Sequence, residues 1–506
     1  MPGIATALQR RPAQGSARKA RWGRQMADPS PSHKRLRLTD EALEDEKDLR
    51  AGFEALLQQA EQPHGTLARA GLTRAVDSHG GYGLFATRDL PSGFELRVPR
   101  RFVLDAYAAS RTTLGRALGG AGFTLEEQLV VVLAAARHAG SGPYCTWAAT
   151  LPTSAPDAAS WPASAKSLLG GTDLGAALAL AEEELQELQS RLAVFASAAG
   201  GESSSTLCGR LGTEELRWAR GMCLSRRFPA FPGNENRGKR AAEVTGEVGR
   251  WGMVGSLIPL MDLLNHSAQA DPSLITFGIA PAASESKGEY AYLRNLAPLR
   301  CGEQAFTNYG RHKSNEELLA SYGFAVSRNP ADRIQLLLAG PGVGSAAPGA
   351  DSATAGAKED PAVFSIERDG EISLQLWRAL NGQASAGDDD SDEPADEDEL
   401  VLQLRRWVTP SAVAALRNAL GTQLRRVFES GTCSEGQAGE AATDCSVAIR
   451  DAVRFYREGT QQVLLAALDM IDRIEGMLDT IVSQRADGNE TNSESESDSD
   501  SDSNHD

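Results

Sequence analysis

A glycine-rich run is the first segment of this sequence that could support chemistry. Gly80-Gly81-Tyr82-Gly83 lacks a Cβ atom at three of its four positions. Such a backbone can approach a ligand closely, and it can adopt positive φ without strain. The same residues could equally form a tight hairpin turn that binds nothing, and the segment by itself favours that simpler interpretation.

Polar side chains at two later points could complete a ligand site. Asn265 and His266 follow an apolar run at 258–264, so both side chains need partners inside the fold. Arg226 ends a helical pattern, and a guanidinium group is suited to binding a carboxylate. An arginine at the end of a helix also lies on the surface in many proteins, so Arg226 alone does not establish a site.

Two tyrosines stand near the end of the same region. Tyr309 ends a predicted strand at 304–308, and Tyr322 follows in the segment Ser321-Tyr322-Gly323-Phe324. A tyrosine hydroxyl can orient a reacting group, although the ordinary role of either residue is to fill the core with its hydroxyl satisfied.

Residues Gly81 to Ala86 also match G-x-G-x-x-A, the phosphate-binding fingerprint of dinucleotide-binding folds. That fingerprint needs a long helix that begins at its second glycine. Here the turn Pro91-Ser92-Gly93 comes eight residues after Gly83, and 94–98 alternates like a strand. The context therefore argues against a dinucleotide oxidoreductase.

His266 by itself would be a core histidine or a candidate metal ligand. No second histidine or cysteine stands at ligand spacing, and the six cysteines contain no C-x-x-C pair. We therefore predict no metal. Widely spaced cysteines also argue against a disulfide scaffold and are typical of a reducing compartment.

The hydrophobic periodicity predicts a mixed protein. The apolar residues alternate as in paired short strands across 67–104, with a turn at 91–93 between 84–90 and 94–98. Helical patterns follow from about 105 to 228 and again over 372–485, and the strands predicted between them are 255–260, 273–279, 289–296 and 304–309. In the last helix, one apolar stripe predicts bundle core: Ile449, Val453, Tyr456, Val463, Ala467, Ile471, Ile474 and Leu478.

The net charge of −17 is concentrated in two tracts. Residues 388–399 hold nine acidic residues and no basic one, and 487–506 hold eight acidic residues with no Lys or Arg. Both tracts are typical of solvated, disordered segments, with binding of a basic protein as the lesser alternative. The rest of the chain is balanced in charge, and we predict neither direct nucleic-acid binding nor a membrane span.

The N-terminal segment supports two interpretations. Residues 1–27 carry six basic residues and no acidic one, which is typical of a chloroplast or other organelle transit peptide. The segment could instead be a disordered arm in which His33-Lys34-Arg35-Leu36-Arg37 is a basic nuclear signal, leaving the protein in the nucleus or cytoplasm.

Four segments in order resemble the SET-domain methyltransferases: GGYGLF at 80–85, LSRRF at 224–228, PLMDLLNHS at 259–267 and residues 302–324. The closest subgroup is typified by the Rubisco large-subunit methyltransferase. The resemblance implies an α+β protein with a β-rich SET domain at 65–330, whose helical insert is about 105–228, and an all-α substrate-binding domain at 355–485. A partly disordered arm at 1–64, a linker at 341–360 and the acidic tail from 487 complete the predicted organisation.

The resemblance also implies a role for each site residue with S-adenosyl-L-methionine as cofactor. Tyr309 would be catalytic, and Tyr322 would line the substrate channel. The cofactor would contact the main chain of Gly80, Gly81, Tyr82 and Gly83. Arg226 would bind the carboxylate of the cofactor, and Asn265 would bind its amino group. Phe228 and the backbone of His266 would lie near the adenine. Arg227 stands where the family more often has a small residue, so which arginine faces the cofactor stays open.

The resemblance implies methylation of a lysine side chain in a protein. The zinc-binding cysteine cluster of many histone-directed members is missing, and C-terminal helices supply the substrate contacts in the subgroup resembled here, so a non-histone substrate is expected. We also expect a monomer. Two alternatives remain open, a protein-histidine N-methyltransferase and a SET-like interaction module without catalysis.

Overall fold

The computed structural model describes residues 40–78, 81–140, 142–198, 208–228, 255–267, 269–281, 288–338, 362–381, 403–404, 406–441 and 445–493. Gly80, the predicted linker 341–360, the acidic tract 388–399 and residues 1–39 lie outside these ranges. The chain divides into two compact units. The N-terminal unit is Pro31–Phe324 with Cys445–Ile449, and the C-terminal unit is chiefly Ala325–Asp444 and Arg450–Asp506.

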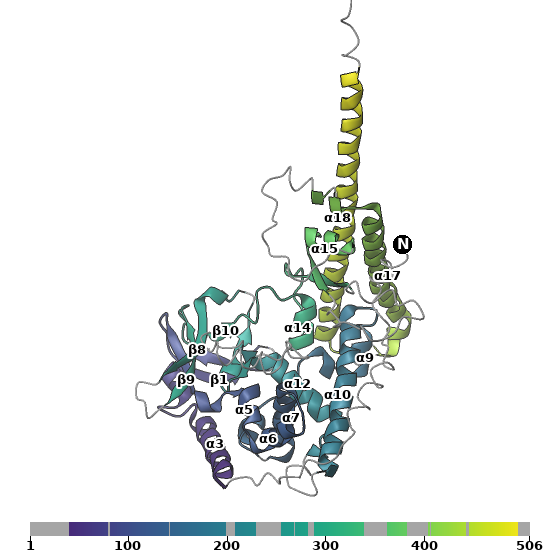
Figure 1. Ribbon diagram of the computed structural model, residues 1–506. Helices are drawn as coiled ribbons and strands as arrows, with labels where there is room; N and C mark the ends of the chain where they lie inside the picture. Colours follow the sequence, from purple (N-terminus) through teal and green to yellow (C-terminus); the bar gives the residue numbers. More distant parts are fainter. Residues whose placement is uncertain are drawn as a thin grey trace, which may run out of the picture. The chain divides into compact units, whose positions relative to one another are not determined.

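Short strands in the described part of the N-terminal unit form three small sheets (Figure 1). The first has the order β1 (Leu72–Val76), β2 (Tyr82–Ala86), β10 (Gln304–Thr307) and β7 (Asn265–His266). The second has the order β3 (Phe94–Pro99), β9 (Glu289–Asn295) and β8 (Ile275–Pro281). The third has the order β4 (Leu104–Asp105), β6 (Ser256–Leu257) and β5 (Arg227–Phe228). The predicted strands all exist, with shifted ends.

The pairing expected between 84–90 and 94–98 is wrong. β2 pairs with β1 and β10, whereas β3 pairs with β9. Register follows the buried face of a strand, and buried Leu96 and Val98 of β3 lie opposite buried Leu293 and Ala291 of β9. No helix follows Gly83, so the argument against a dinucleotide fold holds.

Helices fill the predicted insert. They are α5 (Ala106–Ser110), α6 (Thr113–Gly120), α7 (Leu125–Ala139), α8 (Cys145–Ala148), α9 (Ala163–Ser167), α10 (Asp173–Ala198) and α12 (Thr213–Arg226). The central one, α7, is apolar on every side from Leu129 to Ala136 and is buried throughout that stretch. Thr124 and Glu127 form a capping box at its start, which satisfies backbone donors that the helix leaves unpaired.

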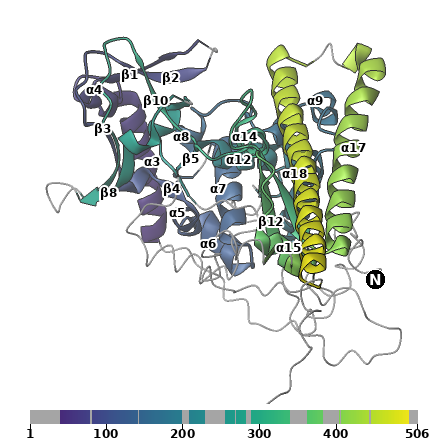
Figure 2. The ribbon, with the colours of Figure 1, turned by 90° about the horizontal axis from the view of Figure 1, so that it is seen from above.

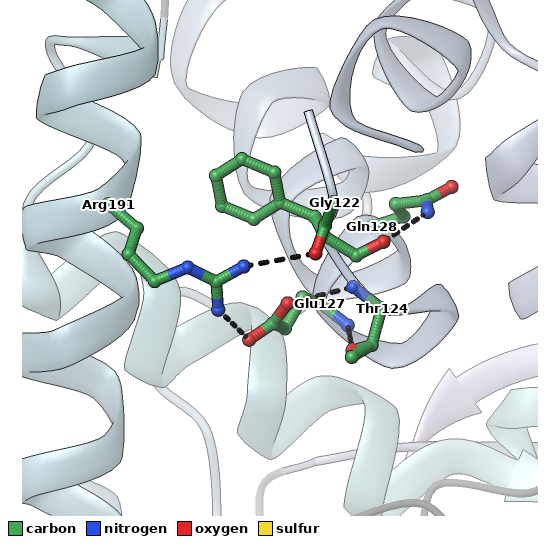
Figure 3. A network of polar contacts seen from close by, with 6 residues as sticks. Gly122, Thr124, Glu127, Gln128 and Arg191 are labelled. Atoms are coloured by element: carbon green, nitrogen blue, oxygen red, sulfur yellow. Dashed lines mark hydrogen bonds and ion pairs between the residues drawn. The ribbon is translucent and has the colours of Figure 1, made fainter. Parts of the chain in front are cut away.

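One arginine ties α10 to the start of α7 (Figure 3). Arg191 Nη1 lies 2.6 Å from Glu127 Oε1, and its Nη2 donates to the carbonyl oxygen of Gly122 at 3.3 Å. Glu127 therefore serves both the helix cap and the contact between the two helices.

The segment predicted as an arm at 1–64 is partly core. Helix α3 runs from Asp40 to Gln59, and α4 (Thr66–Ala70) follows it. Phe53 is fully buried, with its ring centroid 4.8 Å from that of Phe102 and 5.6 Å from that of Tyr144. The few apolar side chains of this charged segment are therefore sufficient to pack it against the rest of the N-terminal unit.

The C-terminal unit is not entirely helical. β11 (Arg333–Leu338) and β12 (Ala362–Glu367) form an antiparallel pair beside α15 (Leu374–Leu380), α17 (Pro410–Ala441) and α18 (Val447–Ser493). Every second residue of β11 is buried, beginning at Ile334, which is the pattern of a strand with one face on a core.

Helices α17 and α18 lie side by side (Figure 1 and Figure 2). Val463, Ala467 and Ile471 of the predicted stripe belong to the core of this unit, and Ile474 and Leu478 pack against that core, which confirms the assignment for these residues. Val453 and Tyr456 are also buried, whereas Ile449 is half-buried. Helix α18 continues to Ser493, so the tail predicted as disordered from 487 begins as helix, because extending an existing helix needs no new nucleation. Within the described residues, no helix has the length and apolar character to cross a bilayer.

Candidate active site

Strand β7 places Asn265 and His266 beside the end of strand β10. The chain takes a positive φ of 70° at Leu260 and makes a short 3-10 turn at Met261–Leu263 with Met261 buried. β7 then pairs in parallel with β10, so that Asn265 lies opposite Phe306 and His266 opposite Thr307. This register places the end of β10, and Tyr309 just beyond it, beside His266.

A pocket of about 140 Å³ lies at this junction. We call it the aromatic pocket, because Phe228, Phe277, Tyr309 and Tyr322 contribute to its wall. The remaining lining residues are Ser225, Arg226, Arg227, Met261, Asp262, Leu264, Ile275, Leu293, Thr307 and Asn308. Four residues predicted to be functional, Arg226, Phe228, Tyr309 and Tyr322, therefore meet at one cavity.

Tyr309 is fixed at both ends of its side chain. Its hydroxyl donates to the carbonyl oxygen of Leu264 at 2.9 Å, and its ring stacks on Tyr322 with centroids 4.6 Å apart. Burial raises the pKa of Tyr309 above its usual value, and Arg226 opposes that shift only in part. The hydroxyl therefore stays protonated at neutral pH and keeps its bond to Leu264.

His266 holds the loop that carries Tyr309. The backbone N–H of Tyr309 donates to His266 Nδ1 at 3.1 Å, so Nδ1 is an acceptor and the ring proton is on Nε2. The ring packs between Tyr309 and Phe324, with centroid distances of 5.3 Å and 5.4 Å. Burial lowers the pKa of His266, which favours this neutral form. No group of three or more His, Cys, Asp or Glu residues suited to a metal ion occurs among the described residues.

Arg226 contacts Asp262, a residue that the sequence did not mark as functional. Its Nη1 donates to the Asp262 carbonyl oxygen at 2.8 Å and lies 3.7 Å from Asp262 Oδ2. Burial raises the pKa of Asp262, and the charge of Arg226 opposes that rise. In the sequence, Asp262 is distinguished only as the one carboxylate inside the otherwise apolar run at 258–264.

The glycine run lies outside the aromatic pocket. We call Asp77, Gly81, Tyr82 and Gly83 the glycine hairpin. Asn265 of strand β7 lies beside it, and Gly80 lies outside the described residues. Neither Gly81 nor Gly83 has positive φ. A Cβ atom on Gly83 would lie 2.2 Å from Gln304 Nε2, so this glycine makes room for protein side chains.

Tyr82 faces away from the pocket. Its side chain is 55% exposed, and its ring lies under the guanidinium of Arg74 at 4.9 Å. Only the backbone of Tyr82 turns toward Asn265, and the resemblance to SET enzymes implies cofactor contact through that backbone. Asn265 Nδ2 donates to the Tyr82 carbonyl oxygen at 3.2 Å.

No protein-family model matches this chain. Among curated proteins, the chloroplastic fructose-bisphosphate aldolase-lysine N-methyltransferase of Arabidopsis thaliana is 25% identical over 257 residues, 49% of this chain and 47% of that protein. The chloroplastic Rubisco large-subunit N-methyltransferase of Nicotiana tabacum is 24% identical over 264 residues, 51% of this chain and 48% of that protein. The chain thus spans about half the length of these two curated relatives.

Solved structures match over a longer stretch. The SET domain of LSMT bound to lysine and AdoHcy superposes with a TM-score of 0.61 at 19% identity, covering 86% of this chain and 93% of that one. The chain has the fold of the LSMT structures. Rubisco LSMT bound to AdoMet gives a TM-score of 0.58 at 18% identity over 85% of this chain and 93% of that one. The α+β class and the likeness to an LSMT SET protein are therefore established.

The site residues suit S-adenosylmethionine in their donor chemistry. Arg226 Nε and Gln304 Nε2 are buried and, within the described residues, have no hydrogen-bond partner. Buried donors of this kind need acceptors, and a carboxylate or a ribose oxygen would provide them. The aromatic pocket is below the range of roughly 300–1,000 Å³ typical of whole-ligand sites. It therefore has the size for an inserted side chain and one end of a larger molecule.

Proposed function

We propose that this chain is an S-adenosylmethionine-dependent N-methyltransferase acting on a lysine side chain of a non-histone protein. The observation that carries the proposal is Tyr309, whose protonated hydroxyl is fixed on the Leu264 carbonyl at the wall of the aromatic pocket. A long apolar side chain that ends in an amine matches such a pocket in shape and chemistry.

The reaction needs a neutral amine at the end of the pocket. A lysine has a reference pKa of about 10.4, and burial against apolar walls lowers it. Phe228, Phe277 and Leu293 supply such walls and exclude water. Bound S-adenosylmethionine would supply an electrophilic methyl group to the amine nitrogen and would be released as S-adenosylhomocysteine. The Tyr309 hydroxyl oxygen accepts from the amine and orients its lone pair, so the contribution of the protein is positioning.

The cofactor residues follow from the same proposal. Arg226 would bind the carboxylate, with Asp262 holding the guanidinium in place, and Phe228 would cover the adenine. Asn265 would bind the amino group. The backbone of His266 and of Gly80, Gly81, Tyr82 and Gly83 would complete the contacts, while the His266 side chain keeps its bond to Tyr309.

The names of the relatives support a metabolic protein as the substrate of this chain. Their names specify fructose-bisphosphate aldolase and the large subunit of Rubisco, and both are called chloroplastic. We extend this to a chloroplast location for the present chain, in line with its basic N-terminal segment. Fractionation of cells that express the full chain with a C-terminal tag checks this location, and tag signal confined to the nucleus would contradict it.

A methyl-transfer assay tests the proposed function. Purified chain is incubated with radiolabelled S-adenosylmethionine and a plastid protein extract, beside Tyr309→Phe and the matched control Tyr107→Phe, whose side chain is 53% exposed on α5. The expected result is a labelled protein band with wild type and Tyr107→Phe, and none with Tyr309→Phe. Amino-acid analysis of the band should yield methyl-lysine.

Each other outcome contradicts a particular part of the proposal. Methyl-histidine in the band would replace lysine as the substrate. Equal labelling by wild type and Tyr309→Phe would remove Tyr309 from catalysis. A wild-type chain that neither labels a protein nor binds S-adenosylmethionine would instead be a SET-like interaction module.

A further inference from the structure

Asn265 of strand β7 makes two hydrogen bonds to the glycine hairpin, one to Asp77 and one to the Tyr82 carbonyl oxygen. Asn265 Nδ2 donates to Asp77 Oδ2 at 2.8 Å, although the two residues are separated by 188 positions. The other carboxylate oxygen of Asp77 accepts the backbone N–H of Gly81 at 2.9 Å, while the N–H of Asp77 donates to the Gly81 carbonyl oxygen at 2.8 Å. Asp77 is therefore fixed by its own hairpin and reaches across to Asn265.

The two glycines leave the space that this bond occupies. A Cβ atom on Gly81 would lie 3.3 Å from Asp77 Oδ2, and one on Gly83 would lie 3.1 Å from Asn265 Nδ2. Residues two apart along an extended chain face the same side. Gly81 and Gly83 thus keep one side of the strand clear for the pair of Asp77 and Asn265.

The partners of Asn265 determine which way its amide points. Asp77 Oδ2 and the Tyr82 carbonyl oxygen are both acceptors, so both must face the amide NH₂ group. Its Oδ1 then faces elsewhere, and no hydrogen bond to Oδ1 is formed by the residues that the structure describes. An oriented amide oxygen beside a carboxylate is suited to binding an ammonium group.

We propose that Asp77 is a positioning residue for the amino end of the cofactor. It holds the Asn265 amide so that Oδ1 is left to accept from the ammonium group of S-adenosylmethionine, and its carboxylate adds negative charge nearby. This inference rests on the proposed function and deepens it. Asp77 is then expected to affect binding of the amino-acid part of the cofactor and not binding of its nucleoside part.

Calorimetry with two ligands tests the inference. S-adenosylhomocysteine carries the amino and carboxylate groups, whereas 5′-methylthioadenosine keeps the nucleoside and the sulfur but lacks both. Asp77→Asn removes the charge with little change in shape. The expected result is an affinity for S-adenosylhomocysteine lower by about tenfold or more, with the affinity for 5′-methylthioadenosine unchanged.

The control is Asp89→Asn. Asp89 is a second loop aspartate that accepts a backbone N–H, that of Cys301, at 2.9 Å, and its variant should bind both ligands like wild type. Equal losses for the two ligands in Asp77→Asn would show that Asp77 only stabilises the hairpin and would overturn the inference, as would no loss for either. Wild-type protein that binds neither ligand would overturn the proposed function, and the inference with it.

Discussion

The aromatic pocket and the glycine hairpin are built in opposite ways. The pocket collects side chains from α12, β8, β9, β10 and α14 (Asn315–Tyr322), and its lining residues are buried or half-buried. The glycine hairpin is a local turn between β1 and β2 in which Gly81 and Tyr82 are exposed, and Asn265 of β7 connects it to the site. Burial therefore sets the protonation states in the pocket, whereas hydrogen bonds to backbone and carboxylate set the geometry of the hairpin.

This difference predicts that each part controls a different quantity. A pocket that positions an amine should govern the rate of transfer, because small displacements of reacting groups slow a reaction strongly. A hairpin that orients one amide should govern affinity for the cofactor. Each of the following changes tests whether the two quantities separate as the structure suggests.

The largest effect is expected from Tyr309→Phe. Loss of the hydroxyl should lower the methyl-transfer rate by about 100-fold or more, because the amine is no longer oriented. Single-turnover measurements at saturating cofactor check this rate. Tyr107→Phe should keep the wild-type rate, and a Tyr309→Phe rate within about threefold of wild type would remove the pocket from catalysis.

The pH dependence of transfer sharpens the role of the pocket. The rate should rise about tenfold per pH unit below the pKa of the substrate lysine, because only the neutral amine reacts. Burial raises the pKa of Tyr309, so its hydroxyl stays protonated and should add no falling limb below pH 10. Rate profiles from pH 7 to 10 check this, and a decline that begins near pH 9 would show that ionisation of Tyr309 is involved.

A smaller effect is expected from Gly83→Ala in the hairpin. The new methyl group would clash with Gln304 Nε2, which must move, and would crowd Asn265 Nδ2, which must shift slightly. We expect affinity for S-adenosylhomocysteine to fall about tenfold and stability to fall by about 1–3 kcal/mol. The comparison is Gly476→Ala in α18, where nothing lies within 4 Å of the added atom. Unchanged affinity in Gly83→Ala would show that the hairpin does not depend on this close packing.

The smallest effect is expected far from both parts. Arg191→Ala removes the contacts to Glu127 and Gly122 (Figure 3) and should lower the free energy of unfolding by about 1 kcal/mol, because the pair is partly exposed. Urea denaturation checks the value against Arg50→Ala, whose exposed pair with Glu54 should contribute less. Cofactor affinity and transfer rate should not change, and a loss of either would mean that the insert supports the site.

The sequence predicted the positions of helices and strands better than it predicted which strands pair. The alternation in β8 and β9 and the apolar stripe of α18 are local patterns, so both could be read directly. The pairing of β3 with β9 could not, because it joins segments that are far apart in the chain. The pair β11 and β12 was missed for a related reason, since the two short strands lie on either side of the segment 341–360 and neither reveals its partner.

The same limit applies to the site. Tyr309, Tyr322, Arg226 and Phe228 were selected by ordered motifs and do meet at one pocket. Asp262 and Asp77 were passed over, because a single carboxylate in an apolar run or beside glycines resembles an ordinary turn residue. Their contacts with Arg226 and Asn265 are what bring these two aspartates to the site.

One paired measurement tests the central claim most directly. Transfer rate and affinity for S-adenosylhomocysteine are determined together for Tyr309→Phe and Asp77→Asn. The account predicts that Tyr309→Phe loses the rate and keeps the affinity, while Asp77→Asn loses affinity and keeps most of the rate at saturating cofactor. If both variants lost rate and affinity in the same proportion, the separation of the two parts would be contradicted.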